Sequence, residues 1–195
     1  MKQKNQKHSI QYMKRFSIFV ATMMMASVMQ AAEKLDLKSI TSGAFSASYV
    51  TGINPIEGTD LYASISSDGK QVVSYSFKTG KQVAVLFDVE AAKAPMKSVE
   101  GYVMSPDGKK MLVFTKSKAV YRRSFKAEYF IYDIARKTIK KLSEGENQQV
   151  ATWSPDSRHI AFVKDNNIFV TDGEKEVQVT KDGKFNEVIN GIPDW

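Results

Sequence analysis

One short pattern, a polar turn that runs into an alternating strand, occurs three times in this chain and limits what the chain can fold into. The copies are ISSDGKQVVSY at 65–75, MSPDGKKMLVF at 104–114 and WSPDSRHIAFV at 153–163. Aspartate recurs in them at intervals of 39 and 49 residues, as Asp68, Asp107 and Asp156. A period of about 40 to 50 residues with several strands in each unit is typical of β-propeller blades.

The residue types in this turn favour its geometry. Proline presets φ at the first central position of a turn, and Asp and Gly accept the conformations that follow. Between the turns, apolar residues come in short alternating runs, as at 82–88, 128–134, 138–142, 167–171 and 176–180. Such alternation indicates half-buried strands, and no long stripe of helical period occurs after residue 32. The one exception is 33–40, where a helix of one or two turns ending at Gly43 is expected.

The sequence therefore predicts an all-β chain that forms a partial β-propeller of three blades and the start of a fourth. The expected segments are a lead-in at 33–43 and an incomplete propeller at 44–195, with blades at 44–95, 96–145 and 146–182 and the next blade starting at 183–195. Propellers close a ring of typically about four to eight blades. Three repeats would leave two open flanks with exposed strand edges, so we expect the chain to associate, aggregate or unfold more readily than a closed ring.

The first 32 residues have the composition of a secretory leader. They contain five basic residues and no acidic residue, with an apolar run at 16–29 and then Ala31 and Ala32. The alternative is a buried or membrane-spanning helix, but a run of about 14 residues is short of the roughly 20 that cross a bilayer. We therefore predict a cleavable signal peptide at 1–32, a periplasmic or secreted protein, and no integral membrane span.

Charge and cysteine content narrow the function classes. The formal net charge is +7, but the residues after the leader hold 23 Lys and Arg against 21 Asp and Glu. This small excess gives no support for nucleic-acid binding, and we expect no nucleic-acid partner. The chain has no cysteine, which excludes disulfides, thiolate metal sites and a cysteine nucleophile within it.

The second repeat is longer than the others because 116–127 (KSKAVYRRSFKA) lies between two of its strands. Insertions in a repeat usually emerge on one face, which is often the binding face. Aromatic residues in and after this stretch could stack on bases or sugars, but their alternation with polar residues favours a half-buried strand; they are Tyr121, Phe125, Tyr129, Phe130 and Tyr132. Taken alone, Arg122 is interpreted as a surface arginine of a long hairpin.

Other candidate residues give weaker signals. Outside the leader, His159 is the only histidine, and its place right after a turn favours strand surface over a general base. Asp165, Asn166 and Asn167 could offer oxygen ligands to calcium, but a calcium loop needs more carboxylates at fixed offsets, so a strand-connecting turn is favoured. None of the 11 glycines is followed two residues later by serine, so the Gly-x-Ser-x-Gly elbow of serine hydrolases is absent.

A longer ordered series of segments carries a family resemblance. It comprises 40–43, 76–80, 101–108, 121–133, 161–169 and 179–195, the last reading VTKDGKFNEVINGIPDW. This series resembles the N-terminal part of the dipeptidyl peptidase IV family, within the prolyl oligopeptidase-type serine peptidases of family S9, and in particular its Bacteroidetes-type members. The resemblance implies a parent protein with an eight-bladed propeller and a C-terminal α/β-hydrolase domain that carries a Ser, Asp, His triad.

The resemblance also implies an activity and a binding residue. Members of the family remove dipeptides with proline or alanine at the second position from free N-termini, while the propeller gates the cavity and binds the substrate's N-terminal end. An arginine in a Trp/Tyr-Arg-x-Ser-aromatic stretch holds a substrate carbonyl, and the matching residue here is Arg122 in YRRSF at 121–125. A planar, permanently charged fork suits that contact. In the family a glutamate pair follows an Asp-Trp motif, whereas here Asp194 and Trp195 are the last residues.

Two functions follow from these observations. The first is the N-terminal propeller fragment of an exported serine dipeptidyl peptidase, inactive by itself because the triad is not in the chain, and needing no metal or organic cofactor. Its partners would be a peptide substrate with a free N-terminus and the C-terminal α/β-hydrolase domain of the same protein, with a homodimer left open. The second is a non-enzymatic TolB-type periplasmic propeller that scaffolds other proteins. Sequence downstream of Trp195 would separate the two.

Overall fold

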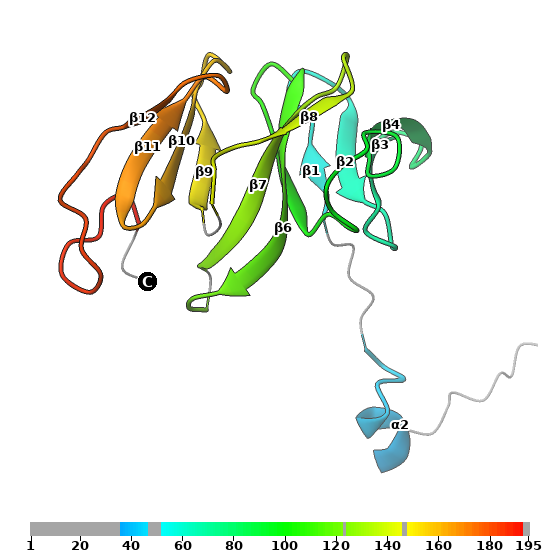
Figure 1. Ribbon diagram of the computed structural model, residues 1–195. Helices are drawn as coiled ribbons and strands as arrows, with labels where there is room; N and C mark the ends of the chain where they lie inside the picture. The colour runs from blue at the N-terminus through cyan, green and yellow to red at the C-terminus, as the bar shows by residue number, and fades with distance from the viewer. Residues whose placement is uncertain (1–35, 47–51, 123, 146–147, 193–195) are drawn as a thin grey trace, which may run out of the picture. The chain divides into compact units, whose positions relative to one another are not determined.

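The computed structural model describes residues 36–46, 52–122, 124–145 and 148–192 (Figure 1). The chain divides into two units, 1–49 and 50–195. The predicted signal peptide at 1–32 lies outside the described residues. In the first unit, helix α2 (Leu37–Thr41) begins after Asp36, whose carboxylate accepts a hydrogen bond from the Ser39 backbone N–H at 2.6 Å. The short helix expected before Gly43 is therefore present.

The second unit contains three four-stranded antiparallel sheets, each a meander in chain order (Figure 1). The first sheet consists of β1 (Asn54–Pro55), β2 (Leu61–Ile65), β3 (Gln71–Ser76) and β4 (Gln82–Asp88). The second consists of β5 (Gly101–Met104), β6 (Lys110–Ala119), β7 (Phe125–Asp133) and β8 (Thr138–Lys141). The third consists of β9 (Gln149–Trp153), β10 (Ile160–Lys164), β11 (Asn167–Thr171) and β12 (Glu176–Gln178). This is the all-β partial propeller that the three repeats predict.

The repeated turns close the hairpins β2–β3, β5–β6 and β9–β10. In the second turn, Asp107 accepts hydrogen bonds from the Ser105 hydroxyl at 2.7 Å and from the Lys109 backbone N–H at 3.1 Å. The other two turns repeat both contacts around Asp68 and Asp156. The residue after each aspartate has a positive φ, as the turn requires; these residues are Gly69, Gly108 and Ser157.

Two apolar cores join the three sheets. Because strand side chains alternate between faces, β6 supplies both cores: Met111 and Val113 pack against the first sheet, and Leu112 packs against the third. All three side chains are completely buried, and each such burial stabilises the fold by about 1.5–3 kcal/mol. The second sheet is therefore buried on both faces, as expected for a blade between two neighbours.

A side-chain hydrogen bond also joins the second and third sheets. The Trp153 indole Nε1 in β9 donates to the backbone carbonyl of Val103 in β5 at 3.2 Å. Burying an indole is favourable only when its N–H finds an acceptor, and the carbonyl of the neighbouring sheet provides one. This hydrogen bond thus ties the end of β9 to β5 of the neighbouring sheet.

The outer strands of the first and third sheets expose apolar side chains. In β4, Val83 and Val85 are 55% and 45% exposed, and within the described part of the chain β4 pairs along one side only, with β3. In β12, Val177 is also exposed, and among the strands that the structure describes this one pairs only with β11. The association expected of an open ring remains a prediction, and these are the edges that would take part in it.

Candidate functional site

Arg122 lies at the tip of the longest hairpin of the described chain, formed by β6 and β7. Figure 1 shows this hairpin reaching past the ends of the neighbouring strands. Segment 116–127, expected as an insertion between two strands, instead extends both strands, since β6 continues to Ala119 and β7 begins at Phe125. Pairing of Lys118 with Lys126 and of Ala119 with Phe125 continues the ladder almost to the tip. The binding candidate is therefore mounted on strands and not on a loose loop.

The tip is a compact turn. The backbone N–H groups of Val120 and Tyr121 both donate to the Ser124 carbonyl, at 2.8 and 3.3 Å, and Tyr121 N–H also reaches the Ser124 hydroxyl at 3.2 Å. Arg122 is exposed, and none of the described residues hydrogen-bonds its guanidinium. The side chain of Tyr121 is 73% exposed. The tip thus holds a cation and an aromatic ring that are both accessible to a ligand.

The root of the extension is an irregularity in β6. Pairing with β7 shifts between Thr115 and Lys118, and Lys116 takes a positive φ of 53°. Two carboxylates bind the residues of this irregularity, Lys116 and Ser117. Glu100 accepts hydrogen bonds from the backbone N–H groups of Lys116 and Ser117 at 2.8 and 2.9 Å, and a further one from the Ser117 hydroxyl. Glu128, whose side chain is 9% exposed, pairs with the Lys116 ammonium at 3.0 Å.

Three aromatic rings pack on the hairpin just below this irregularity. The centroid of the Phe114 ring lies 5.1 Å from those of Phe125 and Tyr129. Gly101 lies opposite Phe114 in β5, and a Cβ at that position would come within 2.1 Å of the Phe114 ring. Burial raises the pKa of Tyr129 to about 12. Tyr129, Phe130 and Tyr132 are buried in β7, which confirms the strand interpretation for these three residues. For Tyr121 the strand interpretation is wrong, because it lies in the turn between β6 and β7 and is exposed.

A hollow of about 330 Å³ lies beside the tip. The hairpin lines it with Val120, Tyr121 and Ser124, and the segment after β12 lines it with Phe185 and Ile189. Phe185 and Ile189 are both exposed. Arg122 follows Tyr121 in the chain but is not itself among the residues that line the hollow. A concave surface of mixed apolar and polar character on the same hairpin tip is suited to an extended peptide ligand.

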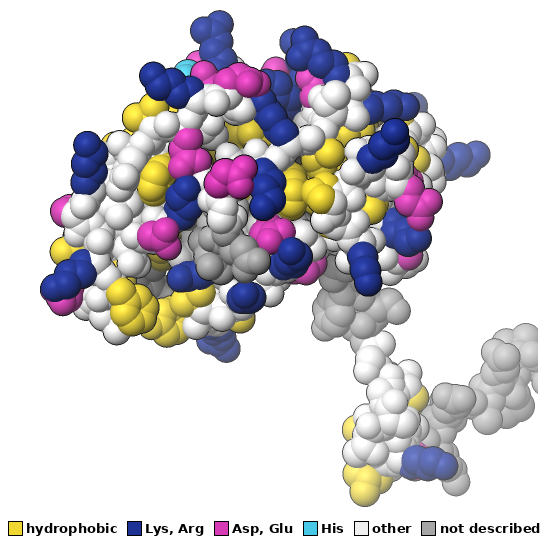
Figure 2. Space-filling view, in the orientation of Figure 1, with side chains coloured by type: hydrophobic (Ala, Val, Ile, Leu, Met, Phe, Trp, Pro, Cys, Tyr) yellow, Lys and Arg dark blue, Asp and Glu magenta, His cyan; other side chains and the backbone are white. Residues whose placement is uncertain are grey.

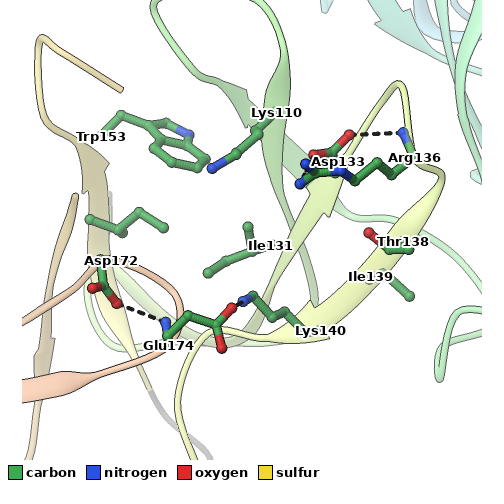
Figure 3. A pocket seen from close by; sticks show the side chains of 11 residues that line it. Lys110, Ile131, Asp133, Arg136, Thr138, Ile139, Lys140, Trp153, Asp172 and Glu174 are labelled. Atoms are coloured by element: carbon green, nitrogen blue, oxygen red, sulfur yellow. Dashed lines mark hydrogen bonds and ion pairs between the residues drawn. The ribbon is translucent and has the colours of Figure 1, made fainter. Parts of the chain in front are cut away.

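A second hollow, of about 240 Å³, lies at the other end of the same two strands, between the second and third sheets (Figure 3). Two ion pairs lie among its charged groups: Lys140 pairs with Glu174, and Arg136 lies 3.5 Å from Asp133. Asp172 accepts hydrogen bonds from the backbone N–H groups that follow it. Since all three of its acidic side chains are engaged by neighbouring groups, this hollow is interpreted as a structural groove between sheets, and we assign it no ligand.

The remaining candidate residues from the sequence lie in or next to turns between strands. His159 is exposed directly after the third turn, and its backbone closes that turn with Ser154. Asp165 and Asn166 have positive φ values in the tight β10–β11 turn, and the Asn167 amide donates to the Asp165 carbonyl at 3.0 Å. Within the described residues no three His, Asp or Glu side chains gather as a metal site. The Asp194–Trp195 motif lies outside the described residues.

The visible face of the sheets carries both signs of charge. Figure 2 shows Lys and Arg side chains interspersed with Asp and Glu over this face. Such mixing gives no extended field of one sign on the face shown. Among the described helices, none has the length and apolar character needed to cross a bilayer.

The known proteins that this chain resembles are peptidases. A sequence model of the family described as "Dipeptidyl peptidase IV (DPP IV) N-terminal region" matches residues 105–195. The chain is 45% identical over 96 residues to "Probable dipeptidyl-aminopeptidase B" of Podospora anserina, covering 47% of this chain and 10% of that protein. It is 34% identical over 167 residues to human "Prolyl endopeptidase FAP", covering 83% of this chain and 21% of that protein.

The fold agrees with a solved structure of the same kind. The crystal structure of Porphyromonas gingivalis dipeptidyl peptidase 4 superposes with a TM-score of 0.74 at 40% sequence identity, covering 84% of this chain and 24% of that one. The chain thus spans between 10% and 24% of the length of these proteins. Sequence and structure together show an N-terminal propeller region of the dipeptidyl peptidase IV type.

Proposed function

We propose that this chain is the propeller portion of an exported serine dipeptidyl peptidase that releases Xaa-Pro and Xaa-Ala dipeptides from free peptide N-termini. The observation that carries the proposal is Arg122, an exposed guanidinium at the tip of a strand-supported hairpin beside a hollow of about 330 Å³. A guanidinium is permanently charged and offers several N–H donors in a fixed fork. It therefore suits a backbone carbonyl of an extended peptide better than a flexible ammonium does.

In this proposal the propeller binds and orients, and bond cleavage belongs to another part of the protein. The chain has no Gly-x-Ser-x-Gly elbow, and His159 is its only histidine after the leader. Acyl transfer by serine needs both a nucleophile and a positioned base. We therefore place the Ser, Asp, His triad in a C-terminal α/β-hydrolase domain. By holding the carbonyl near the substrate's N-terminus, Arg122 would fix which peptide bond reaches the nucleophile. The basic and apolar leader at 1–32 supports export.

The proposal is tested with the protein encoded by the complete reading frame. Arg122→Ala should lower kcat/KM for a Gly-Pro chromogenic amide by about 10- to 100-fold, the equivalent of one charge-assisted hydrogen bond. Arg136→Ala is the matched control: Arg136 is exposed, lies at the opposite end of β7, and should leave kcat/KM unchanged. Unchanged kinetics for Arg122→Ala would reject its role. No hydrolysis by the intact protein would instead favour the non-enzymatic TolB-type scaffold.

A further inference from the structure

The irregularity in β6 determines the direction of the Arg122 hairpin. A β-bulge bends its strand and increases the local twist, so the strand beyond it points in a new direction. Here the register with β7 shifts between Thr115 and Lys118, four residues before Arg122. A change in the geometry of this bulge would therefore change the position of the hairpin tip.

Glu100 is bound to the bulge through both carboxylate oxygens. Its Oε1 accepts from the Lys116 backbone N–H at 2.8 Å, and its Oε2 accepts from the Ser117 backbone N–H at 2.9 Å and from the Ser117 hydroxyl. These N–H groups lie between the paired residues of the ladder, where bulged groups lose strand partners. Glu100 is itself fixed to β6, because its backbone N–H donates to the Phe114 carbonyl at 2.9 Å.

The bonding pattern is that of an ionised carboxylate. Burial acts to raise the pKa of Glu100, but hydrogen bonds from the Ser117 hydroxyl and from the Ser117 and Lys116 backbone outweigh it, so the pKa lies below its usual value. On the other side of the bulge, the Lys116 ammonium pairs with the largely buried Glu128 of β7. The Lys116–Ser117 bulge is thus bound by Glu100, the residue before β5, and by Glu128 in β7.

We infer that Glu100 is a positioning residue, which fixes the bulge at Lys116 and Ser117 and thereby the place of Arg122 relative to the hollow beside the tip. The inference rests on the proposed function, since it assigns Glu100 a role through Arg122. Glutamine in place of Glu100 keeps the shape of the side chain but turns an NH₂ group toward one of the two N–H donors. Glu100→Gln should therefore increase the mobility of the hairpin tip without creating a cavity in either apolar core.

Two measurements test this inference. The first is hydrogen exchange of the tip amides at 117–122, which should become about 10-fold faster in Glu100→Gln while the melting temperature stays within about 2 °C of the wild type. The second is hydrolysis of the Gly-Pro amide by the intact protein, where kcat/KM should fall about 3- to 10-fold. In an Arg122→Ala background, Glu100→Gln should cause no further loss. The control is Glu90→Gln. Glu90 is an exposed carboxylate after β4 that pairs with Lys70, so its substitution should change neither the exchange of the tip amides nor kcat/KM.

The outcomes separate the two claims. Unchanged tip exchange in Glu100→Gln overturns the positioning role whatever the kinetics show. Faster exchange with unaltered kcat/KM overturns it too, provided that Arg122→Ala is impaired, and leaves the proposed function standing. If Arg122→Ala has full activity, the proposed function fails and the inference that depends on it fails as well. Faster exchange together with a kinetic loss that disappears in the Arg122→Ala background supports both.

Discussion

The Ser157 hydroxyl accepts a hydrogen bond from the Asp107 backbone N–H at 3.0 Å, which links the third repeated turn to the second. Ser157 occupies the position that Gly69 and Gly108 hold in the other two turns, and it takes a positive φ of 60° although it has a Cβ. It is 7% exposed. The left-handed backbone costs a non-glycine residue roughly 1 kcal/mol, so this contact between repeats offsets a local strain.

We therefore expect Ser157→Ala to lower the free energy of unfolding more than Ser157→Gly. Alanine keeps the strain and leaves the Asp107 N–H without its acceptor, at a cost of about 1–3 kcal/mol. Glycine loses the same hydrogen bond but relieves the backbone, so its net change should stay within about 1 kcal/mol. Urea denaturation of the three proteins measures the ranking. Equal stability of the wild type and Ser157→Ala would show that the link contributes nothing.

The turn aspartates predict a loss of stability in acid. The Ser105 hydroxyl, followed by the Lys109 backbone N–H, lowers the pKa of Asp107, and Asp68 and Asp156 are lowered by the matching contacts in their turns. A carboxyl with a lowered pKa in the folded state stabilises the fold above its unfolded pKa, and that contribution is lost as pH falls through the folded pKa.

The free energy of unfolding should therefore decline as the pH falls below the ordinary Asp pKa of about 4, because the unfolded chain takes up these protons more readily than the folded chain does. Asp107→Asn should flatten this decline, because the amide no longer titrates. Urea unfolding at several pH values measures the slope. An unchanged slope in Asp107→Asn would contradict the prediction.

The exposed edge of β4 predicts association of the chain. Val83 and Val85 present apolar side chains on a strand whose outer backbone groups have no neighbouring strand among the described residues. Edges of this kind pair with other chains, and a lysine on the edge suppresses that pairing. Sedimentation velocity of residues 33–195 should show concentration-dependent oligomers, and Val83→Lys with Val85→Lys should shift the population toward monomer. A wild-type chain that stays monomeric at all concentrations would refute this.

Much of the fold could be predicted from local pattern, because turns and strands depend on neighbouring residues. The Ser-x-Asp turns lie at the strand junctions that the repeats indicate, and the strands at 82–88 and 167–171 have the expected bounds. The β6–β7 hairpin extends further than the sequence pattern predicts. Alternation breaks where Lys116 and Ser117 form the bulge, so the local pattern indicates an insertion there although the strand continues beyond it.

The supports of the candidate site could not be predicted in this way. Glu100 and Ser117 are 17 residues apart, and only the meeting of β5 with the bulged β6 brings them together. The sequence around Glu100 has no feature that marks it. Gly101 likewise lies in no turn that would call for glycine. The structure explains it by the Phe114 ring, which leaves no room for a Cβ at this position. Arg122 was found through the family resemblance, because in local pattern it is an ordinary surface arginine.

The double burial of β6 has a consequence for how this hairpin can vary. With Met111 and Val113 committed to one core and Leu112 to the other, the strand cannot slide by one residue without turning each side chain into the wrong environment. Length changes beyond the bulge cannot be absorbed by slippage at the root. Successive side chains of a strand point to opposite faces. Insertions or deletions in β6 or β7 beyond the bulge would therefore keep Arg122 on its present side only if they add or remove two residues at a time.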